Sequence, residues 1–196
     1  MSIASQLINL CLSGFLIVGI YQFYFWCQRN TLFAARELGL PLDERIPYSP
    51  GWVWIYSFLY YPVILYLNAN FRSAQEFTQV AASFLLLLAL QSAFFLLFPV
   101  RTPDHWRAIN LRRTLSERFL AFVQRFDASN NSFPSMHTSV ATLTALHLYS
   151  HLGILVFAFP ALIGVSCLLT KQHYLVDVPA GAGLGWFVYH VYQQLA

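Results

Sequence analysis

The chain of 196 residues is 58% hydrophobic, only 10% charged and carries a formal net charge of +3. A soluble domain would carry about 25% charged residues, so the composition excludes an ordinary soluble protein and favours an integral membrane protein. The length allows a single membrane domain over residues 1–196. The bilayer is the expected partner, no nucleic-acid partner is expected, and a homo-oligomer stays open.

Six apolar stretches have the composition of transmembrane helices. They are residues 3–26, 52–67, 77–98, 135–151, 153–169 and 174–193. The first has no basic segment before it and is too long for a signal peptide, so we expect a retained helix. Only the turn sequence "HLG" separates the fourth from the fifth, which predicts a tight helical hairpin. The sequence therefore predicts an all-α membrane protein, a bundle of six transmembrane helices.

Two polar loops stand between these stretches. Residues 28–50 are rich in proline and turn formers, and residues 99–134 carry six arginines. In the second loop apolar residues recur near helical spacing, and these are Leu111, Leu115, Phe119, Phe122 and Val123. This pattern predicts an amphipathic helix in the membrane interface. Tryptophans near the ends of the stretches indicate an aromatic belt, and these are Trp52, Trp54 and Trp106.

The sixth stretch contains "GAGLG" at residues 181–185. This run superficially suggests a nucleotide-binding loop, but it follows no strand and lies within an apolar span. Gly181 and Gly185 instead form a small-xxx-small pair, which lets two helices approach closely. We therefore expect the sixth helix to pack tightly against a neighbour at these two positions.

The charges bear on orientation. With six spans, the loops after the first, third and fifth share one side of the membrane, and they contain ten of the eleven lysines and arginines. The positive-inside rule alone would make that side cytoplasmic. Arginines that bind an anionic substrate would mislead this rule, because they serve the substrate rather than the topology.

Polar residues gather at the span ends on this same side. His173 and Asp177 are four residues apart, so they share a helical face. The aspartate can fix the tautomer of the histidine and leave a neutral nitrogen as nucleophile or base. Ser135 and His137 lie in the first turn of the fourth stretch, where free backbone N–H groups and the helix dipole favour phosphate. Arg101 ends the third stretch nearby.

The pattern resembles the type 2 phosphatidic acid phosphatase superfamily. Its second signature, Pro-Ser-Gly-His, corresponds to Pro-Ser-Met-His at residues 134–137. Its third, Ser-Arg-x5-His-x3-Asp, corresponds to Ser166, His173 and Asp177, and the likeness covers about residues 95–185. The segment "IPYSPGWVWIY", residues 46–56, also resembles the branch that contains sphingomyelin and inositol-phosphorylceramide synthases.

The resemblance implies a lipid phosphoesterase that works through a phosphohistidine. His173 would attack phosphorus, with Asp177 orienting the ring. His137 would protonate the departing alcohol and then activate the incoming one. Ser135 and the neighbouring backbone N–H of Met136 would hold phosphate oxygens. No metal or organic cofactor is implied, and the usual orientation of the superfamily favours a site that faces away from the cytoplasm.

Two cations of the signatures are missing from this chain. The first signature, K-x6-R-P, has its arginine at Arg101, but Phe94 replaces its lysine. Cys167 occupies the arginine position of the third, which leaves Lys171 as the nearest substitute for phosphate binding. A phosphodiester carries one negative charge and a phosphomonoester nearly two. The loss of cations therefore favours transfer of a phospho-headgroup from a phospholipid to a lipid alcohol or water.

Three alternatives stay open. A lipid phosphate monoesterase, acting on phosphatidate or a prenyl phosphate, would use the same histidines. A non-catalytic lipid carrier or flippase would account for the missing cations but not for the histidines. A zinc site made of His137, His173 and Asp177 has no recognised spacing and leaves Ser135 and Lys171 unexplained.

Overall fold

The computed structural model describes residues 2–195, which are helical apart from loops and two isolated β-bridges. The α-helices are α1 (Ile3–Arg29), α2 (Pro41–Arg45), α3 (Val53–Phe58), α4 (Tyr60–Ala69), α5 (Ala74–Leu97), α6 (Asp104–Ala108), α7 (Leu115–Phe126), α8 (Met136–Leu152), α9 (Ala158–Leu169) and α10 (Asp177–Leu195). Two short 3-10 helices, η1 (Pro50–Trp52) and η2 (Gly153–Phe157), precede α3 and α9. The prediction of an all-α protein is confirmed.

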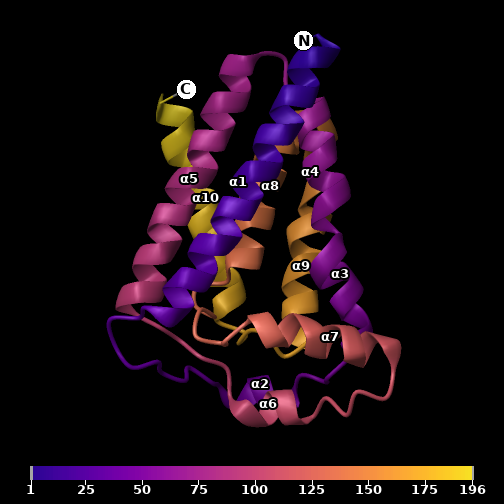
Figure 1. The fold of residues 1–196 in the computed structure, drawn as a ribbon, viewed down its shortest axis with the longest axis vertical. Coiled ribbons are helices and arrows are strands. Elements are labelled where there is room, and N and C mark those ends of the chain that lie inside the picture. Colours follow the sequence, from indigo (N-terminus) through magenta and orange to yellow (C-terminus); the bar gives the residue numbers. More distant parts are fainter. Residues whose placement is uncertain (1, 196) are drawn as a thin grey trace.

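The long helices run along the long axis of the molecule, and α1 begins at the same end at which α10 finishes (Figure 1). The shorter α2, α6 and α7 lie across the opposite end (Figure 1). Within residues 2–195, three segments are long and apolar enough to cross a membrane, namely Ile3–Arg29, Ala74–Leu97 and Met136–Leu169. They support a membrane protein, whereas the count of six spans stays a prediction.

The third of these segments is the predicted hairpin, because it comprises α8, η2 and α9. Gly153 follows the last residue of α8 with φ +59, in the left-handed region that favours glycine. The chain then turns through η2, and α9 packs back against α8. The tight turn at "HLG" is therefore confirmed.

The predicted amphipathic helix is α7, which starts at Leu115 rather than near Leu111. Thr114 sets this start, because its hydroxyl accepts from the backbone N–H of Glu117 while the Glu117 carboxylate accepts from that of Thr114. The helix lies across one end of the bundle (Figure 1). Its outward face carries exposed apolar side chains, as a helix in a membrane interface does, and these are Leu115, Phe122 and Phe126.

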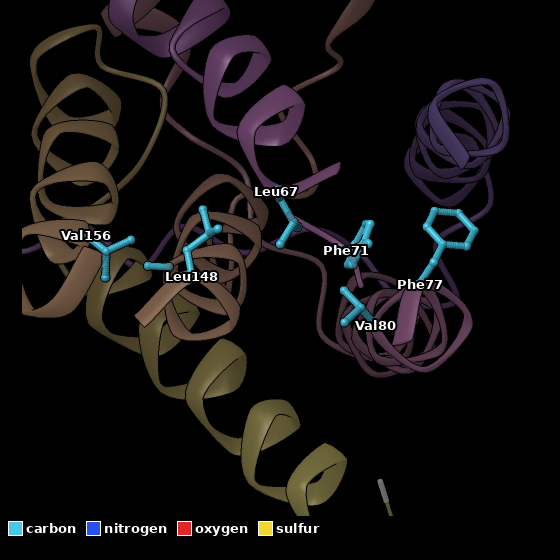
Figure 2. Close-up of a cluster of buried hydrophobic side chains, with 7 residues drawn as sticks. Leu67, Phe71, Phe77, Val80, Leu148 and Val156 are labelled. Atoms are coloured by element: carbon cyan, nitrogen blue, oxygen red, sulfur yellow. The ribbon is translucent and has the colours of Figure 1, made fainter. Parts of the chain in front are cut away.

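A buried apolar cluster joins α4, α5, α8 and η2. Figure 2 shows its side chains in a row from Val156 and Leu148, through Leu67 and Phe71, to Val80 and Phe77. Between helices in lipid, packing rather than the hydrophobic effect provides most of the stabilisation. This cluster therefore holds the four elements together through the fit of its side chains.

The helices α8 and α10 approach each other closely at two glycines. A Cβ added at Gly181 would collide with the Ser135 carbonyl oxygen, and one added at Gly185 would collide with that of Ser139. The backbone N–H of Ser135 also donates to the Asp177 carbonyl at 3.0 Å. The predicted tight packing at the two glycines is confirmed, and it places the start of α8 beside the start of α10.

Replacing Gly185 with alanine is expected to destabilise the fold by about 1–3 kcal/mol, because the added methyl presses on the Ser139 backbone. Gly183→Ala on the same helix is the matched control, because nothing lies within 4 Å of an added Cβ there. Alanine is the better helix former, so the control is expected to be neutral or slightly stabilised. Thermal unfolding of the purified variants in detergent measures both, and equal midpoints would contradict the tight contact.

Candidate active site

His173 lies in the turn between α9 and α10 and is only 6% exposed. Its Nδ1 is 2.9 Å from the carbonyl oxygen of Ser132 and 3.3 Å from Oδ2 of Asp177. Both partners can only accept, so we assign the ring proton to Nδ1 and leave Nε2 with its lone pair. Asp177 Oδ2 also accepts from the backbone N–H of Tyr174 at 2.8 Å, so one carboxylate holds both the ring and the turn.

His137 lies in the first turn of α8 and faces His173. The two ring centroids are 5.8 Å apart, with 68° between the ring planes. Tyr56 of α3 stacks against the His137 ring at 4.2 Å, and the Tyr60 hydroxyl donates to the His137 carbonyl. Across residues 2–195 neither ring nitrogen of His137 has a hydrogen-bond partner. The ring is therefore positioned by its faces, with both nitrogens free to exchange a proton or bind a ligand.

Gln91 of α5 fixes the turn that precedes His137. This side chain is fully buried, which is costly for an amide unless it is hydrogen-bonded. Its Nε2 donates to the Pro134 carbonyl, and its Oε1 accepts from the Ser139 hydroxyl at 3.1 Å. Sequence reasoning missed Gln91, because a single glutamine in an apolar helix carries no local pattern.

Ser135 is the N-cap of α8 and is fully buried. Its Oγ accepts from the backbone N–H of Thr138 at 3.3 Å. The hydroxyl therefore provides a partner for one N–H of the first turn of α8. The backbone N–H groups of Met136 and His137 belong to the first turn, which has no partners within the helix. These two N–H groups are therefore the donors that a helix N-terminus offers to an anion.

Cys167 of α9 lies beside the two histidines. It is fully buried, and its Sγ lies within 4.8 Å of a ring nitrogen of His137 and of His173, which are themselves within that distance of each other. The position at which the superfamily signature has an arginine therefore holds a small, uncharged thiol beside both histidines.

Lys171 is directed away from these histidines. Its Nζ donates to the carbonyl oxygen of Asp43 at 2.6 Å and lies 4.8 Å from the centre of the Trp106 ring. Burial lowers the pKa of this ammonium, and the carboxylates of Glu44 and Asp43 partly offset the shift. Lys171 therefore links the turn between α9 and α10 to α2 and α6.

Arg101 does not reach the histidines either. Its guanidinium pairs with the Glu37 carboxylate at 3.1 Å, and both side chains are about half exposed. Only its backbone approaches the site, because its carbonyl accepts from the Tyr174 hydroxyl at 2.9 Å. Arg107, a further arginine of this loop, donates to the Gln124 and Asp127 carbonyls and so secures the end of α7.

Asp43 of α2 is a second residue that sequence reasoning missed. It is 1% exposed, and its Oδ1 accepts from the backbone N–H of Leu175 at 2.6 Å. Together with the bond from Lys171 to its carbonyl, this contact fastens the chain on both sides of His173. The proline-rich loop at residues 28–50 is therefore part of the support of the site.

Trp106 corrects the expected aromatic belt. It is only 2% exposed, its Nε1 donates to Glu44 Oε1 at 2.9 Å, and its ring lies 5.1 Å from that of Tyr174. The hydrogen bond from the Trp106 N–H lowers the pKa of Glu44. The indole is therefore a buried packing residue that connects α6 to Glu44 of α2 and to Tyr174 of the histidine turn.

An apolar cavity of about 170 Å³ adjoins His137 and lies among α1, α4, α5 and α8. The residues of α8 on its wall are Met136, His137, Val140 and Thr144. Ile17 and Ile20 of α1 face them. A cavity of this composition suits a hydrocarbon chain, and one of its walls carries a candidate catalytic histidine.

No curated protein and no solved structure matches the chain. The family model described as the PAP2 superfamily matches residues 45–191, which is more than half of the chain. The matched range contains His137, Cys167, His173 and Asp177 and extends beyond the expected 95–185. The chain belongs to the PAP2 superfamily, whose signatures its sequence resembles.

Proposed function

We propose that the chain is a lipid phosphoesterase that transfers a phospho-headgroup from a phospholipid to a lipid alcohol or water. The observation that carries the proposal is the facing pair of histidines, one of which has its proton held on Nδ1 by Asp177. Membership of the PAP2 superfamily suggests phosphatase or phosphotransferase activity and so supports the class of reaction.

The reaction proceeds in two steps. Nε2 of His173 attacks phosphorus, the bond to the departing alcohol breaks, and His137 gives that oxygen a proton. Asp177 stabilises the positive charge that develops on the imidazole of His173. In the second step His137 takes a proton from the incoming alcohol or water, whose oxygen attacks phosphorus and releases His173.

The charge around the histidines favours a phosphodiester. The Cys167 thiol is uncharged, and the ammonium of Lys171 is engaged by Asp43 and Trp106. The first-turn N–H groups of Met136 and His137 remain to hold phosphate oxygens. Such donors match the single charge of a diester better than the near-dianion of a monoester.

Of the two acceptors in our proposal, the sequence resemblance favours a lipid alcohol over water. Residues 46–56, which resemble the sphingomyelin and inositol-phosphorylceramide synthase branch, end at Tyr56, and this ring stacks on His137. The segment therefore reaches the site and supports a ceramide-like acceptor. A carrier or flippase would need no such hydrogen-bonded histidine and aspartate, so the geometry favours catalysis.

We also propose six spans with the site facing away from the cytoplasm. The six spans would be α1, α3–α4, α5, α8, α9 and α10. Of these, α1 and α5 each meet the length and composition of a membrane helix, and α8 and α9 lie together in the third such segment. Both ends of the chain would then be cytoplasmic. Labelling of a Ser2→Cys variant from the cytoplasmic side supports this orientation, and labelling from the outer side alone would reverse it.

The reaction is tested with purified protein and three substrates: phosphatidic acid, a phosphodiester lipid, and that lipid with ceramide. We expect turnover of the diester and a loss of about 10³-fold or more in His173→Ala. His190→Ala is the matched control, because His190 is exposed on the same helix α10.

Two outcomes would overturn parts of this proposal. If neither the wild type nor the control turns over any of the three substrates, the chain is not this enzyme. If phosphate is released from phosphatidic acid while diesters stay intact, the preference for a diester is wrong.

The cavity predicts where the substrate chain lies. Val140→Trp places an indole one turn from His137, on the cavity wall, and is expected to raise KM for a long-chain lipid by about tenfold or more. A short-chain substrate that does not reach the cavity is expected to keep its kinetics. Val18→Trp, on the exposed side of α1, is the control. Equal losses for long and short chains would contradict this assignment.

A further inference from the structure

We propose that His137, Cys167 and His173 bind one divalent metal ion of the zinc type. The three side chains come from α8, α9 and the turn before α10, and the close contact of α8 with α10 brings two of them together. The ligand set differs from the zinc site that the sequence suggested, because Cys167 replaces Asp177. The ion acts as an inhibitor in this proposal, and the reaction of the enzyme does not use it.

The spacing of the donor atoms fits such an ion after a small adjustment. The Cys167 sulfur and one nitrogen from each histidine lie within 4.8 Å of one another. Tetrahedral zinc, with bonds of about 2.0–2.3 Å, places its ligands about 3.3–3.6 Å apart. The donors therefore need to close by at most about 1.5 Å, which rotation of the side chains provides.

The surroundings of His173 orient it as a metal ligand. Its Nδ1–H donates to the Ser132 carbonyl and to Asp177, so Nε2 is left as the donor atom. A carboxylate behind a ligating histidine is the usual support of a zinc ligand. The ring nitrogens of His137 have no competing hydrogen bond among residues 2–195, so this side chain is free to bind.

The charges also balance. On binding, the Cys167 thiol loses its proton to solvent and becomes a thiolate, whereas both histidines bind as neutral rings. A divalent ion and one thiolate leave a charge of +1, which the buried Asp177 carboxylate below His173 offsets. The site is therefore neutral as a whole, as a buried metal site should be.

Metal binding and phosphoryl transfer exclude each other. Both use the Nε2 lone pair of His173, so an ion held there blocks the proposed nucleophile. Three protein ligands leave a fourth position, which water or a phosphate oxygen can fill. This inference gives a physical reason for a cysteine at the arginine position, which phosphoryl transfer does not supply.

The test is a Co²⁺ titration of the purified full-length protein, followed by absorption. We expect one ion per chain, a sulfur-to-cobalt charge-transfer band, the visible bands of four-coordinate cobalt, and loss of this spectrum when Zn²⁺ is added. Cys167→Ser is expected to lose the charge-transfer band. Cys27→Ser, which alters another fully buried cysteine far from the histidines in the sequence, is expected to keep it.

Absence of the charge-transfer band from the wild type would overturn the proposal, as would its persistence in Cys167→Ser. If Cys167→Ser does not fold, Asp177→Asn provides the second variant, and it is expected to weaken Co²⁺ binding by roughly 10–100-fold. Unchanged affinity in a folded Asp177→Asn protein would contradict the role of the carboxylate. None of these measurements needs turnover, so their outcome is independent of the proposed reaction.

Discussion

The backbone contact between α8 and α10 is the constraint on which the site depends. Gly181 and Gly185 let the two helices approach until carbonyl oxygens of α8 lie against α10, and the Ser135 N–H bonds to the Asp177 carbonyl. The two helices carry different halves of the site, so a larger side chain at either glycine would separate His137 from the His173 turn. The contact between α8 and α10 therefore both packs the fold and sets the relative position of the two histidines.

Around this contact, buried polar groups position the histidines while the cations of the loops serve the structure. Asp43 and Lys171 tie the histidine turn to α2, and Arg101 pairs with Glu37 near the surface. What remains at the centre is two imidazole rings, a thiol and backbone N–H groups beside an apolar cavity. This environment has little positive charge, which is why we infer a singly charged lipid phosphodiester as substrate and a soft metal ion as competitor.

The sequence predicted what depends on short spacing. His173 and Asp177 are one helical turn apart, and the turn at residues 134–137 precedes an apolar run, so both halves of the site were recognisable. Gln91 and Asp43 were not, because the contacts that link them to the candidate site join residues 43 and 128 or more positions apart in the sequence. The predicted phosphate role of Lys171 rested on its closeness to His173 in the chain, which does not specify the direction of a long side chain.

The central claim, that His173 carries the phosphoryl group, is tested most directly by trapping the intermediate in His137→Ala. A substrate with a nitrophenol leaving group needs no acid for the first step, whereas the second step still lacks its base. Quenching in alkali and mass spectrometry of the peptides should then find a phosphorus adduct on His173 that acid removes. Turnover without any adduct, or an adduct on another residue, would contradict this account.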